Sequence, residues 1–181
     1  MIELERAWSE RTPSPVGHGT VRLICQRQGD GVHHLPRQVV IDVESGVVGD
    51  RWSLSPSPNR DAQVTLMNVQ VATLIAGTRA PIDGVGDNFL VDLDLSEGAA
   101  PVGSRIRIGS ALLEVTAKPH RGCAKFRQRF GEDAYAWVAE GSNAEGRWPT
   151  RRLRGVNCRV LEGGEVALGD EVRVVAPVTT R

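Results

Sequence analysis

Short stretches in which apolar and polar residues alternate recur along most of the chain. A period of two residues is typical of strands with one buried face. The residues between these stretches are rich in glycine, and Gly109-Ser110 has the length and composition of a two-residue hairpin turn. Many short strands joined in this way favour a mainly β domain in which the sheet closes into a β-barrel. The pattern predicts strands at 21–25, 37–43, 63–67, 89–91, 105–108, 112–115, 155–161 and 171–175.

Helical patterns are fewer, and they predict a small number of peripheral helices. Asn68 precedes a segment whose apolar positions share one helical face, so Asn68 is expected to cap a helix that begins at Val69. Phe126 and Phe130 are four residues apart and predict a helix after 123, and helical sequence resumes at 133–140. We find no βαβ alternation and no linker, which indicates one domain at 20–176, preceded by an extension or loop at 1–19 and followed by a tail at 177–181.

The charge balance limits the classes of partner. The chain has 22 basic and 22 acidic residues, so it has no net attraction for nucleic acid or for an anionic membrane. Only 4% of the residues are aromatic, which also disfavours a base-stacking surface. Twenty of the 22 basic residues are arginines, the side chain best suited to bidentate binding of phosphate or carboxylate.

The N-terminal sequence and the cysteine content indicate the compartment. The first residues show no basic-then-apolar signal pattern, and no apolar run is long enough to span a membrane. Three scattered cysteines do not make a disulfide framework. We therefore expect a soluble protein of the reducing cytoplasm.

The stretch from Lys118 to Lys125 is the strongest candidate for chemistry, because it combines Cys123 and His120 with three basic side chains. Each nearby positive charge favours the thiolate form of Cys123, and so does a position at the start of a helix. A functional thiol is therefore favoured over a small buried hydrophobe. His120 is either the partner of this thiolate or an exposed loop residue, and the sequence does not decide between the two. Cys25 and Cys158 lie in apolar strand patterns, so we expect them to be buried and inert.

Two further clusters are candidate ligand sites. His33-His34 has no second ligand pair at zinc spacing, which favours a simple loop. The run from Arg151 to Gly155 is either a solvated edge or an anion site. We expect Arg154, directly before Gly155, to hold an anion and the residues Arg151 and Arg152 to be a solvated edge.

An ordered set of motifs resembles the MOSC domain family, which is named after the C-terminal domain of molybdenum cofactor sulfurase. The set spans about 21–175, and no single motif is specific by itself. The chain differs from many members at Trp52, where they have histidine, and at Gly122, where proline is commoner. It is similar to stand-alone bacterial members. The matching motifs are Gly49-Asp50-Arg51, 63–66, Asp87-Asn88 with 89–91, Val102-Gly103 with Ile108-Gly109, Pro119-His120 with Cys123, 154–157, and 164–166 with Gly169-Asp170.

The resemblance implies a closed, mostly antiparallel barrel with peripheral helices, together with a specific chemistry. Cys123 would carry sulfur as a persulfide or ligate the metal of a molybdenum cofactor, with His120 as its catalytic partner. Family members act in sulfur transfer or as parts of reductases of N-hydroxylated compounds. The cofactor-binding residues implied here are Arg51, Asn88, Arg121, Lys125, Arg154 and Asn157.

The resemblance also bears on cofactors and partners. The desulfurase domain of the eukaryotic sulfurases is absent from this sequence, so pyridoxal phosphate is not expected in this chain. Sulfur would come from a donor such as a cysteine desulfurase, or electrons from an electron-transfer protein. Two alternatives stay open: a metal-free cysteine-dependent transferase or hydrolase with His120 as base, and a non-catalytic module that binds a small anion or a partner.

Overall fold

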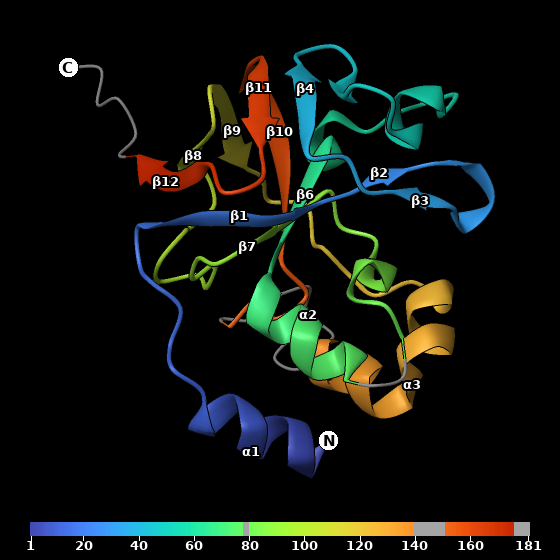
Figure 1. Ribbon diagram of the computed structural model, residues 1–181, viewed down its shortest axis with the longest axis vertical. Helices are drawn as coiled ribbons and strands as arrows, with labels where there is room; N and C mark the ends of the chain where they lie inside the picture. The colour runs from blue at the N-terminus through green and yellow to red at the C-terminus, as the bar shows by residue number, and fades with distance from the viewer. Residues whose placement is uncertain (78–79, 140–150, 176–181) are drawn as a thin grey trace.

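The computed structural model describes residues 1–77, 80–139 and 151–175 (Figure 1). The loop expected at 141–150, the last residue of the helix expected at 133–140 and the tail expected at 177–181 lie outside the described residues.

A closed barrel of seven strands forms the body of the molecule, as the sequence predicts. The predicted strands agree with the observed ones to within three residues at each end, and all of them belong to the barrel except the strand predicted at 37–43, which lies in a separate sheet. Around the barrel the order is β1 (His18–Ile24), β12 (Glu171–Val175), β8 (Arg105–Ile108), β9 (Ala111–Val115), β10 (Val156–Glu162), β6 (Val64–Asn68) and β7 (Phe89–Val91).

One strand pair departs from the antiparallel pattern. β6 and β7 run parallel, with Leu66 opposite Phe89. Parallel neighbours need a crossover connection, and here α2 (Val69–Ala76) and the 3-10 turn η4 (Ile82–Val85) supply it. The side chain of Asn68 caps α2 as predicted, accepting a hydrogen bond from the backbone N of Gln70 at 2.8 Å. The sequence prediction of no βαβ unit is therefore wrong at this crossover.

Two apolar cores lie on the two faces of this parallel pair. Leu66 and Phe89 face the barrel core, whereas Met67 and Leu90 face a second core under the helices. Every residue of β6 is buried, because the strand is covered on both faces. β6 is thus a barrel strand on one face and packs against the helices with the other.

The helices α1 (Ile2–Glu10), α2 and α3 (Ala124–Ala139) lie together on one side of the barrel (Figure 1). Gly131 has φ 87° and divides α3 into two segments, which match the two helical stretches predicted from the sequence. The extension expected at 1–19 is more than a loop, since it contains α1. Trp8 of this helix packs edge-to-face on Trp137, with 5.9 Å between ring centroids.

Small elements flank the barrel. β11 (Gly164–Ala167), β4 (Gln38–Asp42) and β5 (Gly46–Val47) form a second sheet, and β2 (Gln26–Arg27) pairs with β3 (His33–His34) around the 3-10 turn η1 (Gly29–Gly31). Two more 3-10 turns, η2 (Arg51–Leu54) and η3 (Arg60–Ala62), follow β5. Within the described parts of the chain, no helix combines the length and apolarity needed to cross a membrane.

Candidate functional site

Two side chains from distant parts of the chain share one buried carboxylate. Oδ1 of Asp87 lies 2.5 Å from Nε2 of His120, and Oδ2 accepts a hydrogen bond from Arg154 at 2.5 Å. The side chain of Asp87 is completely buried, and that of Arg154 is 7% exposed. A buried carboxylate needs such partners, because its desolvation is otherwise too costly.

The local backbone explains why these residues meet. Asp87 follows η4 and precedes β7, His120 lies in the turn after β9, and Arg154 precedes β10. Gly155 has φ 90°, and a Cβ atom there would lie 2.1 Å from the carbonyl oxygen of Leu66. Glycine therefore lets the chain pass close to β6 and brings the preceding Arg154 over the second core.

Arg154 is held by several groups at once. Its guanidinium donates to the carbonyl oxygen of Val85 at 3.0 Å as well as to Asp87. Its Cζ atom lies 5.0 Å from the ring centroid of Phe126, within cation–π range. Arg154 therefore fixes the cluster to the helical layer, and it is already paired with an anion belonging to the protein itself.

The contacts of His120 assign its tautomer. Nε2 faces a carboxylate oxygen at 2.5 Å and an arginine nitrogen at 2.9 Å. A guanidinium cannot accept a hydrogen bond, so the short contact is explained by a proton on Nε2 that is donated to Asp87. In the neutral ring the lone pair then lies on Nδ1, to which none of the described residues donates or accepts a hydrogen bond.

Burial and charge set the protonation states of this pair. Burial, and then the positive charge of Arg154, lower the pKa of His120 below its ordinary value of 6.5, although Asp87 opposes them. Burial alone would raise the pKa of Asp87, but the charges and hydrogen bonds of Arg154 and His120 outweigh it and lower that pKa to about 2. At neutral pH the cluster consequently holds an aspartate anion, an arginine cation and a neutral imidazole.

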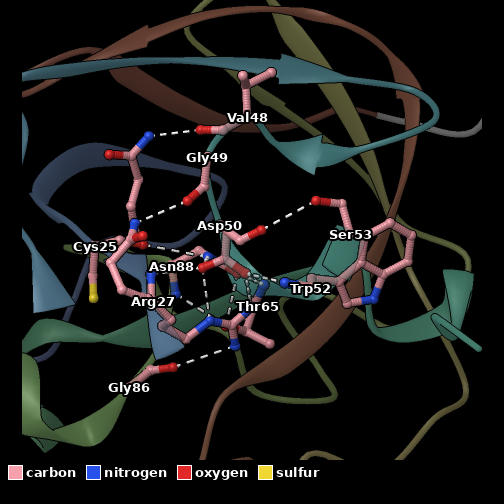
Figure 2. A network of polar contacts seen from close by, with 12 residues as sticks. Cys25, Arg27, Val48, Gly49, Asp50, Trp52, Ser53, Thr65, Gly86 and Asn88 are labelled. Carbon is pink, nitrogen blue, oxygen red and sulfur yellow. Dashed lines mark hydrogen bonds and ion pairs between the residues drawn. The ribbon is translucent and has the colours of Figure 1, made fainter. Parts of the chain in front are cut away.

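A second polar network lies beside the first and is centred on Asp50 (Figure 2). Asp50 accepts hydrogen bonds from Nε of Arg27 at 2.9 Å, from the backbone N of Trp52 at 2.9 Å and from Nδ2 of Asn88 at 3.0 Å. Asp50 has two roles in this network. Its bond from Trp52 caps η2, and Asp50 also forms a largely buried ion pair with Arg27.

Asn88 is fully engaged within this network (Figure 2). Its Nδ2 donates to Asp50 and to the carbonyl oxygen of Cys25, and its Oδ1 accepts from the backbone N of Thr65 at 3.1 Å. The side chain is completely buried. Asn88 thus joins β6, β7 and the chain after β1. The preceding residue, Asp87, points to the other network, because successive side chains of an extended chain point to opposite sides.

Cys123 is the exposed cysteine of the chain. It directly precedes α3, and its carbonyl oxygen accepts a hydrogen bond from the backbone N of Arg127 at 3.1 Å. Arg121 and Lys125 on either side of it are also exposed.

Cys25 and Cys158 are buried, which confirms that part of the prediction made for them. Burial raises the pKa of Cys25 to about 12, and burial also raises the pKa of Cys158. Neither is a thiolate at neutral pH, which leaves Cys123 as the cysteine that solvent can reach.

The remaining predicted residues have different surroundings. Arg51 is exposed in η2. Asn157 is 3% exposed in β10, where its Nδ2 donates to the carbonyl oxygen of Lys118 at 3.1 Å and holds the turn that leads to Cys123. Arg152 was expected on a solvated edge together with Arg151, and this is wrong, because Arg152 is 3% exposed and donates to the carbonyl oxygen of Ala100.

Sequence reasoning missed two members of the site. Asp87 and Arg27 were not proposed as functional residues, although each makes ion-pair contacts at the centre of one network. The only signal for Asp87 was its position before Asn88 in one of the motifs. Arg27 follows a strand as an ordinary basic residue, and its pairing with Asp50 spans 23 residues.

The molecule is a small closed β-barrel that helices cover on one side. It carries an exposed cysteine in a basic turn, so its class is that of cysteine-bearing β-barrel domains. The MOSC domain model matches residues 59–173, which is more than half of the chain. The chain therefore belongs to the MOSC domain family. No curated protein matches it.

Several solved structures share the fold of this chain. The YuaD protein from Bacillus subtilis has 18% sequence identity and a TM-score of 0.58, with 88% of this chain and 96% of that chain covered. YiiM from Escherichia coli has 18% identity and a TM-score of 0.57, with 88% and 71% covered. YiiM from Geobacillus stearothermophilus has 15% identity and a TM-score of 0.59, with 90% and 77% covered. At these identities the similarity is one of fold.

Proposed function

We propose that this MOSC protein uses the thiolate of Cys123 either to carry sulfur as a persulfide or to bind a molybdenum cofactor, in the latter case as part of a reductase of N-hydroxylated compounds. The observation that carries the proposal is the contrast between the cysteines. Cys123 is exposed in a basic turn, whereas Cys25 and Cys158 are buried. A thiolate is both the nucleophile of sulfur transfer and a ligand for soft metals.

The sulfur-carrier role requires one exchange step. The thiolate of Cys123 attacks the outer sulfur of a persulfide on a donor protein. A new S–S bond forms at Cys123, the S–S bond of the donor breaks, and the donor cysteine leaves as a thiolate with the electron pair. No external oxidant or reductant is consumed, and Cys123 retains the transferred sulfur.

His120 is the proposed proton acceptor of the site. Asp87 holds Nε2–H, so the lone pair on Nδ1 is available for a proton or a hydrogen bond. Arg154 favours the neutral ring, which is the form able to accept a proton. Asp87 and Arg154 are in this view positioning residues, since they act through the orientation and charge of His120.

The groups available around Cys123 suit a metal that is held by the organic part of the cofactor and by one protein thiolate. The described residues contain no group of three His, Cys, Asp or Glu side chains able to hold a bare metal ion. Exposed Arg121 and Lys125 suit the phosphate of the cofactor. When bound, the molybdenum cofactor would supply a redox-active metal for reduction of a substrate.

The other predicted cofactor residues receive different proposed roles. Arg154 and Asn88 are already paired inside the protein, so we assign them to positioning of the site and not to direct contact with the cofactor. Asn157 is buried and donates to the carbonyl oxygen of Lys118, so it too is assigned to positioning, whereas exposed Arg51 stays a candidate for contact with the cofactor.

The proposal is tested by loading the protein during expression with cofactor synthesis and with a cysteine desulfurase. Molybdenum content and the mass of the intact protein are measured for the native chain, for Cys123→Ser and for Cys25→Ser as control. We expect bound molybdenum, or one extra sulfur atom, in the native chain and in Cys25→Ser, and neither in Cys123→Ser. Equal loading of all three proteins would refute the role of Cys123.

The Asp87–His120 pair favours one second candidate, a metal-free cysteine-dependent acyl transferase or hydrolase. An imidazole oriented by a carboxylate is what a thiol nucleophile needs as its base. Incubation with an activated thioester distinguishes this candidate. An acyl group on Cys123 that forms and then turns over would support it, and a stable or absent adduct would exclude it.

A further inference from the structure

Basic charge is concentrated around the functional cysteine, although the chain as a whole is neutral. From Lys118 to Gly131 the sequence contains five lysine or arginine residues and no aspartate or glutamate, whereas the complete chain has 22 of each sign. The stretch includes the turn before α3 and the first segment of that helix. We call the five side chains the cationic rim: Lys118, Arg121, Lys125, Arg127 and Arg129.

Most of this charge is not neutralised by the protein. All five side chains belong to exposed residues. Lys118, Arg121 and Lys125 form no ion pair with any part of the chain that the structure describes. Arg129 donates to the carbonyl oxygens of Gly84 and Gly31, which leaves its positive charge uncompensated.

Arg127 is the exception within the rim. Its Nε lies 3.3 Å from Oε1 of Glu132, and both side chains are largely exposed. The opposite charges of this pair largely cancel at a distance, so Arg127 adds little to the field of the rim. The other four side chains therefore present a positive field to solvent, since the described residues place no carboxylate within ion-pair distance of them.

The cysteine lies within the reach of this field. Arg121 and Lys125 are each two residues from Cys123, so their Cα atoms lie within about 7 Å of its Cα even in a fully extended chain. The Debye length at 0.1 M ionic strength is about 10 Å. Any molecule that reaches the exposed Cys123 therefore passes through a positive potential that salt only partly screens.

We propose that the cationic rim is the docking surface for an acidic protein that delivers sulfur or electrons to Cys123. This inference rests on the proposed function of Cys123. Exposed cations on long, solvated side chains spread over a surface steer a large partner that carries several carboxylates, beyond any single phosphate that two of them can contact. The buried cation of this region, Arg154, is already committed to Asp87, which leaves the exposed side chains to act from the rim.

The test uses thiol–disulfide exchange with three synthetic peptides. Each has a central cysteine in a mixed disulfide with a chromogenic aromatic thiol, flanked by four glutamates, four serines or four lysines. The Cys123 thiolate attacks the peptide sulfur, a new S–S bond forms, and the aromatic thiolate leaves with the electron pair and is measured. We expect the acidic peptide to react about tenfold faster than the serine peptide at low ionic strength.

Salt and matched variants make the result specific. The advantage of the acidic peptide should disappear at 1 M salt, where the Debye length is about 3 Å. It should also be lost or inverted in Arg121→Glu/Lys125→Glu. The control is Arg107→Glu/Arg173→Glu, which changes the net charge equally on neighbouring strands β8 and β12, on the other side of the molecule from α3 (Figure 1).

The ratio of acidic-peptide rate to serine-peptide rate is the readout, because it cancels any change in the reactivity of the thiol itself. A ratio near one, or a ratio unaltered by Arg121→Glu/Lys125→Glu, would overturn the proposal. A small dianionic disulfide accelerated where the acidic peptide is not would also overturn it, in favour of a small-anion site.

The test is separable from that of the proposed function. Exchange requires neither molybdenum nor persulfide, and Cys123→Ser shows whether the signal comes from this cysteine. A charge-dependent ratio in a protein that never loads molybdenum or sulfur would therefore keep the docking surface and reject the proposed chemistry.

Discussion

Nε2 of His120 and a guanidinium nitrogen of Arg154 lie 2.9 Å apart although each carries a proton to donate. Their approach is tolerated because Asp87 accepts from both. The carboxylate thus holds together two groups that would otherwise repel, and the geometry of the site depends on it.

Removal of this charge should be costly. Asp87→Asn leaves the buried guanidinium of Arg154 without its anion, and breaking a buried pair in this way typically costs about 3–5 kcal/mol of unfolding free energy. Urea denaturation measures the loss. The control is Asp133→Asn, whose carboxylate is 80% exposed and pairs with the N-terminus, and which should cost under about 1 kcal/mol. A similar loss for both variants would contradict the buried-pair account.

The stability of the protein should fall in two steps as pH is lowered. Folding lowers the pKa of His120, so below about pH 6.5 the unfolded chain takes up a proton that the folded chain resists. The contribution of His120 to the free energy of unfolding is therefore complete above about pH 6.5 and is lost below it. The pKa of Asp87 is lowered from 3.8 to about 2, so a further loss on the order of 2 kcal/mol follows between pH 4 and 2.

Denaturation midpoints across this range test both steps. His120→Gln keeps an N–H that can be donated to Asp87 but does not titrate, and it should therefore lose the upper step alone. Persistence of the upper step in this variant would mean that another group causes it.

Gly155 should tolerate no side chain. In Gly155→Ala the Cβ would collide with backbone atoms of β6, and φ 90° is unfavourable for alanine, so we expect a loss on the order of 3–4 kcal/mol. Gly169 has a similar φ of 87° but open space around its Cβ position, and Gly169→Ala should cost only about 1 kcal/mol. The midpoints of thermal unfolding of the two variants separate the cost of the steric collision from the cost of the unfavourable φ.

Alkylation of the native protein should modify Cys123 first. Iodoacetamide reacts with thiolates, and burial with a raised pKa protects Cys25 and Cys158. Mass spectrometry of digested protein should find one rapid site, absent in Cys123→Ser, and two further sites only after denaturation. Fast labelling of Cys158 in the folded state would disprove its assignment to the core.

The barrel strands could be predicted because each carries its own signal. In β8, for example, Ile106 and Ile108 are buried and the arginines between and before them are partly exposed, which is visible as alternation in the sequence. The helix α1 has a weaker signal, because Leu4 and Trp8, four residues apart, pack against the second core but none of its residues is fully buried. Its position depends on contacts such as the hydrogen bond from Trp137 to Glu5, which joins residues 132 positions apart.

The site was predictable only in part for the same reason. Cys123 and His120 stand out because their basic neighbours are adjacent in sequence. The pairing of Arg154 with Asp87 joins residues 67 apart, and nothing local marks it. The burial of Arg152 was missed because a run of arginines is usually a solvated face, whereas here the chain turns inward, with φ 45° at Arg152.

The order of two neighbouring residues, Asp87 and Asn88, has a consequence for any redesign of this domain. The double variant Asp87→Asn/Asn88→Asp keeps composition, charge and volume, yet it would set a carboxylate against Asp50 and leave Arg154 facing an amide. Two anions would then meet in a buried network while a buried cation lost its counter-ion. The domain is in this respect sensitive to the order of its residues as well as to their kind, and a comparison of composition, net charge or side-chain volume would not detect the damage.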